Sequence, residues 1–201
     1  MLKRMPRRAL ITGLTGAWIA ARSAFAAQQA GAVESSRGEC YAQTAAARRA
    51  LAPAADVFIG DTVGTGEQSA LSLHLGTATQ VKLGPEARLR IDRFVVNAGG
   101  VLVLESGGMV YDHDPNVDQG NVAVRVPFGL VAVRGTRFFV GPSNGVFGVF
   151  VARGLVMVVG VNTAMMVASG FGSDLPRAGA EPEVPHAWGA ARIASAMASV
   201  N

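Results

Sequence analysis

The chain has 201 residues, of which half are hydrophobic and 25 are glycine. This length allows one domain with a sizeable core, and abundant glycine with few aromatic residues favours short strands and frequent turns over long helices. Five of the 18 basic residues and none of the 14 acidic residues lie in the first 26 positions, so the other 13 basic residues nearly balance the acidic ones. This near-neutral remainder has no electrostatic reason to bind a phosphate backbone, which argues against a nucleic-acid-binding protein.

Residues 1–26 have the organisation of a secretory signal peptide. A basic stretch that ends in Arg7-Arg8 precedes an apolar run over residues 9–21, and small residues occupy the peptidase positions in Ala24-Phe25-Ala26. The run is shorter than the ~20 residues that a helix needs to span a bilayer. We therefore predict cleavage after Ala26 and no stable membrane span. The Arg7-Arg8 pair also resembles a twin-arginine export signal, but such pairs occur in other secretory signals, so the export route stays open.

Cys40 is the only cysteine, so the chain has no internal disulfide and the core alone must hold the fold. It lies well beyond the apolar run, which argues against a lipid anchor at this position. Two roles remain for the thiol: it cross-links two chains, or it fills a small buried position.

Short apolar runs separated by turn residues extend from Asp56 to Val161. Apolar and polar residues alternate over 71–75, 81–83, 89–91 and 122–126, which is typical of strands with one buried and one wet face. Each run is too short to be stable alone, so the strands must stack. We predict an all-β fold, a β-solenoid-like stack of short strands, with a β-sandwich as the alternative.

Three later segments are apolar on both faces and predict central strands: 128–133, 147–152 and 155–159. Arg153-Gly154 separates the last two and predicts a tight hairpin turn.

The strand pattern ends after Val161, so residues 162–201 are predicted to form a loop and a short C-terminal helix. Residues 172–186 are rich in proline, glycine and charge, and Trp188, Ile193, Met197 and Val200 then roughly share one helical face. We expect this helix to cap the end of the β stack, where an apolar face and an open edge would otherwise be exposed.

Three motifs, in order along the chain, resemble the FecR domain family. Residues 59–66 resemble its G-D-x-V-x-T-G opening, and residues 71–76 with 81–85 resemble the next strands, although 76–79 depart slightly from the usual Asp-Gly pair. Residues 127–138 are similar to its P-x-G…A-V-R-G-T-x-F signature. The best match covers residues 56–161, within an expected β domain of residues 27–161.

The resemblance implies an extracytoplasmic, solenoid-like β domain. In the best-known members this domain receives a signal from an outer-membrane siderophore receptor, and a membrane helix passes it to a cytoplasmic sigma factor. We expect this chain to lack the parts that pass the signal, so the sigma-regulator role is not carried over. The signature residues implied to be structural or partner-binding are Gly60, Asp61, Thr65, Gly66, Pro127, Gly129, Val133, Arg134, Gly135, Thr136 and Phe138.

Arginines flank the glycine of the last signature. Arg134 and Arg137 fall on opposite faces of a regular strand, and Gly135 permits a bulge between them. Both have apolar neighbours, so at least one is expected to be partly buried against a carboxylate or several carbonyls. A structural tie between neighbouring strands and a partner contact are both consistent with this arrangement.

The residue types in Asp112-His113-Asp114, with Asp118 nearby, could form a metal site, but their spacing is poor for one. In an extended strand His113 points away from the two aspartates, and Asp114-Pro115-Asn116 is good turn chemistry. No catalytic motif is evident and the histidines are dispersed. We predict no catalytic residues, no metal and no cofactor.

The sequence therefore predicts a non-catalytic periplasmic domain that binds a protein or cell-envelope partner, with a scaffold or envelope-signalling role. A carbohydrate- or peptidoglycan-binding module is the alternative, although few aromatic residues are present to form such a site. An enzyme is the third hypothesis.

Overall fold

The computed structural model describes residues 28–95, 99–118 and 120–201, so the predicted signal peptide lies outside the described residues. The elements in chain order are β1 (Gln29–Arg37), β2 (Cys40–Gln43), β3 (Arg48–Ala50), β4 (Asp56–Phe58), β5 (Thr62–Thr65), β6 (Ala70–Leu75), β7 (Thr79–Leu83), β8 (Arg88–Val95), β9 (Gly99–Ser106), β10 (Met109–His113), β11 (Asn121–Val126), β12 (Gly129–Ser143), β13 (Val146–Val159), β14 (Ala164–Ala168), β15 (Phe171–Leu175), β16 (His186–Ala187) and α1 (Ala190–Ala198).

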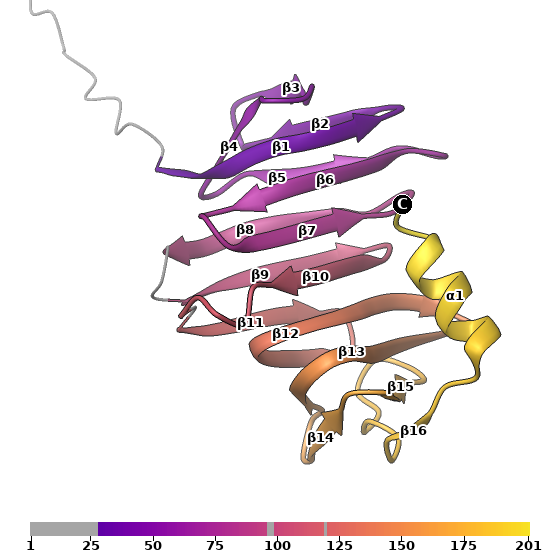
Figure 1. Cartoon of the computed structure of the whole chain (residues 1–201). Helices are drawn as coiled ribbons and strands as arrows, with labels where there is room; N and C mark the ends of the chain where they lie inside the picture. The colour runs from indigo at the N-terminus through magenta and orange to yellow at the C-terminus, as the bar shows by residue number, and fades with distance from the viewer. Residues whose placement is uncertain (1–27, 96–98, 119) are drawn as a thin grey trace, which may run out of the picture.

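The described strands form one sixteen-stranded sheet that curls back on itself (Figure 1). One half contains β3, β2, β5, β8, β9 and β11 in that order, and the other contains β4, β1, β6, β7 and β10. Strand β12 joins the halves, because its first part pairs with β11 and its later part pairs with β10. The strand pairs are antiparallel except for β9 with β11.

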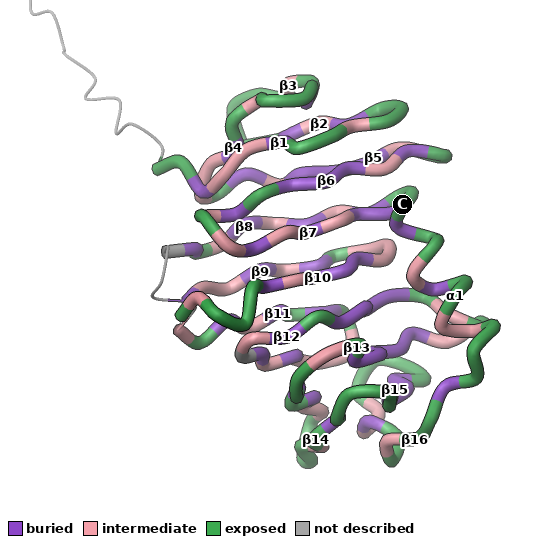
Figure 2. Tube along the Cα trace, viewed as in Figure 1, coloured by how far each residue is buried: buried purple, intermediate pink, exposed green. Residues whose placement is uncertain are grey.

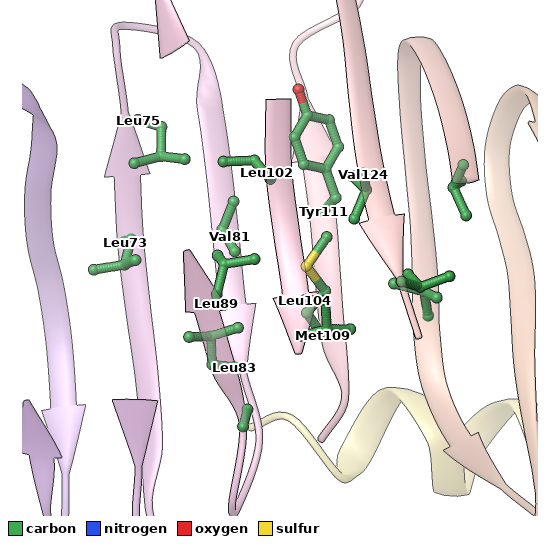
Figure 3. Packing of buried hydrophobic residues seen from close by; sticks show 14 of the residues in the cluster. Leu73, Leu75, Val81, Leu83, Leu89, Leu102, Leu104, Met109, Tyr111 and Val124 are labelled. Carbon is green, nitrogen blue, oxygen red and sulfur yellow. The ribbon is translucent and has the colours of Figure 1, made fainter. Parts of the chain in front are cut away.

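Figure 2 shows the buried residues that recur along the strands of both halves. The inward side chains of both halves meet in one core, part of which Figure 3 shows. Alternation along each strand produces this arrangement, since β7 buries Val81 and Leu83 while Gln80 and Lys82 are only partly covered. The largest fully buried side chains are Tyr111, Phe138, Phe139, Leu71, Leu73, Leu75, Leu83, Leu89, Ile91, Leu102, Leu104 and Met109.

The all-β prediction is confirmed, but the finer architecture is not clearly either of the two forms left open by the sequence. The strands form one continuous curled half-barrel, which fits neither the solenoid nor the sandwich cleanly. The sequence does not distinguish these forms because period-two alternation specifies a buried face and leaves the route between strands open.

Arg153-Gly154 does not form the predicted hairpin turn; it lies inside the 14-residue strand β13. The register between β12 and β13 shifts at this level, next to Gly135. Gly135 has φ +61° and Gly154 has φ +89°, values that L side chains rarely adopt. The two glycines therefore let both long strands bend together as they pass from one half of the sheet to the other.

Residues after Val161 contain strands that the sequence analysis missed. Strand β14 pairs with the C-terminal part of β13, β15 pairs with its N-terminal part, and β16 pairs with β15. Strand β14 reads Ala-Met-Met-Val-Ala, without the polar alternation that marks a half-buried strand.

The predicted C-terminal helix is present as α1, but it does not cap the end of the stack. It packs on the outer face of the sheet, where Val110, Phe139 and Phe150 form a second cluster with Trp188, Ala196 and Val200. Val110, Phe139 and Phe150 are outward apolar side chains of β10, β12 and β13. This outer face would therefore expose apolar area to water without the helix, as the end of the stack would. None of the described helical residues forms a segment long and apolar enough to cross a membrane.

Candidate protein-binding surface

Asp61 of the first signature is buried and forms an ion pair with Arg49. Its carboxylate lies 2.5 Å from an Arg49 nitrogen and accepts the Phe58 backbone N–H at 2.9 Å. The preceding Gly60 adopts φ +92°. The Gly60-Asp61 turn therefore links β3 to the β4–β5 connection, and the side chain of Asp61 is directed away from the surface.

Thr65 and Gly66 connect successive turns at one edge of the stack. The Thr65 hydroxyl donates to Gly84 O at 2.6 Å and accepts the Ala87 N–H at 2.9 Å. The Gly66 N–H donates to Glu39 O at 2.9 Å. The two Thr65 bonds are buried and satisfy turn backbone groups that water does not reach.

The last signature, residues 127–138, begins with the turn at Pro127 that joins β11 to β12. Gly129 has no space for a side chain, since an added Cβ would lie 2.4 Å from Val159 O. Val133 and Phe138 point into the core, and the Phe138 ring lies 5.4 Å from that of Tyr111.

Thr136 is fully buried, and its hydroxyl has no hydrogen-bond partner among the described residues. Arg137 is exposed and lies 3.6 Å from Asp112, which Arg153 also contacts at 2.8 Å. The side chain of Arg134 lies outside the described part of the chain. The structure thus disperses the signature residues over turns and core and does not gather them in one surface site.

His113 is a structural histidine in this fold. Its Nε2 lies 2.9 Å from Val117 O and its Nδ1 lies 2.9 Å from the Thr79 hydroxyl. A carbonyl only accepts, so Nε2 donates to Val117 O. Within the described residues no group of three or more metal-ligating side chains is present.

Asp114 forms the predicted turn with Asn116. Its carboxylate accepts the Asn116 backbone N–H at 2.9 Å, and this bond holds the pKa of Asp114 below its usual value. Cys40 is buried, and its burial raises the pKa of the thiol. The structure therefore matches the role of Cys40 as a small buried side chain.

An apolar face, defined by Ala132, Leu155, Met157 and Met166, lies on the outer side of β12, β13 and β14. Leu155 is 48% exposed, Met157 37% and Met166 54%. The strand register places Ala132 beside Met157 and Met157 beside Met166, so the side chains form a continuous row. They line a depression of about 620 Å³.

The sequence pattern does not reveal this face, because residues 155–159 are apolar throughout and predict a strand covered on both sides. One side is buried through Val156 and Val158, but the other is open. A row of large apolar side chains that stays exposed indicates an interaction surface, because a partner that covers the row removes its apolar area from water.

The anchor of α1 is a second feature that the sequence did not reveal. Arg192 binds Asp174 through two hydrogen bonds of 3.0 and 2.6 Å, and its guanidinium lies 3.5 Å from the centre of the Trp188 ring. Trp188 rests on Gly148 and Gly172, where an added Cβ would meet the ring at 2.8 and 2.3 Å. The helix is thus held by a nearly buried ion pair and a tryptophan seated on two glycines.

A polar groove of about 340 Å³ lies along β1, β6 and β7, beside the last residue. Glu34 accepts hydrogen bonds from Ser72 at 2.6 Å and Gln80 at 2.5 Å, and the Ser72 hydroxyl is the main cause that lowers the pKa of Glu34. Lys82 is held at 2.8 Å by the Asn201 side chain. The residues that line this groove include no aromatic ring.

The fold and its surfaces define an all-β domain that offers an apolar face and a polar groove. Residues 61–157 match the family model described as FecR protein, so this part of the chain is a FecR domain.

Two crystal structures of a candidate anti-sigma factor from Parabacteroides distasonis ATCC 8503 are similar in fold. Each gives a TM-score of 0.56 at 16% identity and covers 67% of this chain. The match covers 63% and 62% of the length of those chains, so the chain spans less than two thirds of them. At this identity the similarity shows the fold alone. No curated protein matches the sequence.

Proposed function

We propose that this protein is an envelope-signalling FecR domain that acts in the periplasm and binds a protein partner through the apolar face. The observation that carries the proposal is the continuous row of Met157 and Met166 with Leu155 beside it, all substantially exposed. Methionine side chains are flexible and polarizable, which suits them to protein surfaces.

The chemistry of the face indicates what the partner presents. None of its four defining side chains carries a charge, while Arg125 on β11 is exposed nearby on the same side of the sheet. A partner that complements it presents apolar side chains with an acidic residue at the rim. The FecR match and the fold shared with a candidate anti-sigma factor support signalling as the purpose of such binding.

The carbohydrate-binding alternative has less support. Tyr41, an aromatic side chain on an outer strand, is covered by the Arg48 guanidinium at 3.6 Å from the ring centre. The polar groove has no aromatic lining on which a sugar ring could stack.

Met157→Lys tests the proposal because it adds a charge to the centre of the face without touching the core. We expect a strain that carries this variant at normal protein level to reproduce the transcript changes of a strain that lacks the gene. Val184→Lys is the matched control, since Val184 is 72% exposed and does not line the depression at the face. A Met157→Lys strain that matches the wild type while the deletion strain does not would refute use of this face.

The location and the directness of binding need separate measurements. Fractionation should place a form lacking residues 1–26 in the periplasm, and recovery of the full-length chain in the cytoplasm would contradict this. A photo-crosslinker at position 157 should form an adduct with one envelope protein, and the same probe at position 184 should not.

A further inference from the structure

The curled sheet ends in four strands that each have one unpaired edge: β3, β4, β14 and β16. Strand β3 has three residues including Arg48 and Arg49, β4 has three residues including Asp56, and β16 has two residues. Edges as short as these resist pairing with another chain, and β3 and β4 also carry charge. Strand β14 differs, because its five residues Ala-Met-Met-Val-Ala carry no charge.

The outward backbone groups of β14 follow from its pairing with β13. Ser169 N–H donates to Gly154 O at 3.1 Å, and Gly160 N–H donates to Thr163 O at 2.8 Å. Backbone groups alternate in direction along an antiparallel ladder, so residues 165 and 167 also face β13. The N–H and C=O groups of residues 164, 166 and 168 therefore point toward the free edge.

The order of residues along this edge is self-complementary. The outward positions read Ala164, Met166 and Ala168, so an antiparallel copy placed about Met166 sets alanine opposite alanine and methionine opposite methionine. We infer that two copies of this chain pair antiparallel along β14, with a two-fold axis at Met166. The pairing joins the two apolar faces into one continuous surface, and it does not depend on the proposed signalling role.

Charge and size favour a second copy and indicate a weak dimer. When two copies of β14 pair, no like charges face each other, because the strand carries no charge. A strand from another protein would gain no ion pair with β14 that could make the pairing selective. One edge of five residues with the adjoining apolar side chains is smaller than the ~20–30 residues a side of a stable interface. We therefore expect a concentration-dependent dimer with a Kd on the order of 100 µM.

Sedimentation velocity of the purified protein over about 10 µM to about 1 mM tests the dimer directly. We expect the weight-average mass to rise toward twice that of one chain. Met166→Lys places two like charges opposite each other and should raise the Kd at least tenfold. Met157→Lys lies one strand inward and should leave the dimer unchanged, so this pair of variants separates the dimer from partner binding on the face.

A cysteine cross-link tests the register. The paired Cα atoms of position 166 would lie ~5.5 Å apart, within the range of a disulfide. Met166→Cys should form a covalent dimer on mild oxidation, whereas Ala50→Cys on the edge strand β3 should not. The native Cys40 is buried and should not compete in this reaction. A monomer at all concentrations, or equal cross-linking of both variants, would overturn the inference. Loss of an envelope partner from Met166→Lys with no dimer in the wild type would show that a foreign strand occupies this edge.

Discussion

The Asp174–Arg192 ion pair gives the sharpest stability prediction, because it fastens α1 to the sheet with little access to water. The two side chains are 11% and 12% exposed, and Arg192 also bonds to the Ser143 hydroxyl at 3.1 Å. Arg192→Leu keeps apolar contact with Trp188 but leaves the Asp174 carboxylate without its partner. Breaking a buried pair in this way costs about 3–5 kcal/mol, and slight exposure to water favours about 3 kcal/mol.

The expected change in melting temperature follows from this free energy. A loss of about 3 kcal/mol lowers the Tm of a domain of this size by about 6–12 °C if the whole domain unfolds together. If only α1 detaches, the fluorescence of Trp188 changes before the far-UV circular dichroism. The fluorescence is specific once residues 1–26 are removed, because the chain has two tryptophans and the other is Trp18.

Urea unfolding followed by both probes measures the effect. Arg88→Leu is the control, because Arg88 and Glu105 form an exposed pair at 3.3 Å that should contribute less than about 1 kcal/mol. The double variant Arg192→Leu with Asp174→Asn should recover part of the loss, since no uncompensated charge remains. A free energy of unfolding for Arg192→Leu equal to that of Arg88→Leu would refute the reasoning.

Three further predictions concern single polar side chains. Asp61→Asn should lower the free energy of unfolding by about 1–3 kcal/mol, because it weakens the bond between the buried Asp61 side chain and Arg49; an unchanged urea midpoint would count against this. Native Cys40 should react with a thiol reagent only as fast as the protein unfolds. Because the pKa of this thiol is raised in the fold, the free energy of unfolding should fall as pH rises above the ordinary thiol pKa. The Cys40→Ala variant should not show this fall. Rapid labelling of the native thiol would contradict that account. The Thr163 hydroxyl is the main cause that lowers the pKa of Glu181, so stability from Glu181 should be present above the ordinary glutamate pKa and lost as pH falls through the lowered value. Thermal unfolding from neutral to acid pH should show this loss, and Glu181→Gln should show less of it.

Much of the strand content was predictable because alternation is a local property. Residues 71–75 and 122–126 lie in β6 and β11, as their pattern indicates, since every second side chain must enter the core. The FecR resemblance was predictable for a similar reason, because turns such as Gly60-Asp61 need particular residues. The ion pair of Asp61 with Arg49 was not, since no local pattern connects positions twelve residues apart.

Segments that are apolar on both faces set the limit of sequence reasoning. The pattern gave 147–152 and 155–159 the same interpretation, yet Trp188 covers Phe150 in the first segment, whereas Leu155 in the second stays about half exposed. Which of two equally apolar surfaces receives the helix depends on Asp174, Gly148 and Gly172, which meet only in the folded chain. The candidate site was hidden for this reason.

Strand β13 takes part in two surfaces of the molecule. Its residues 155–159 carry part of the apolar face, and its residues 146–151 carry Gly148 and Phe150, on which Trp188 rests. The backbone between them bends at Gly154. One continuous polypeptide segment thus carries both a surface that faces outward and the seat of the C-terminal helix.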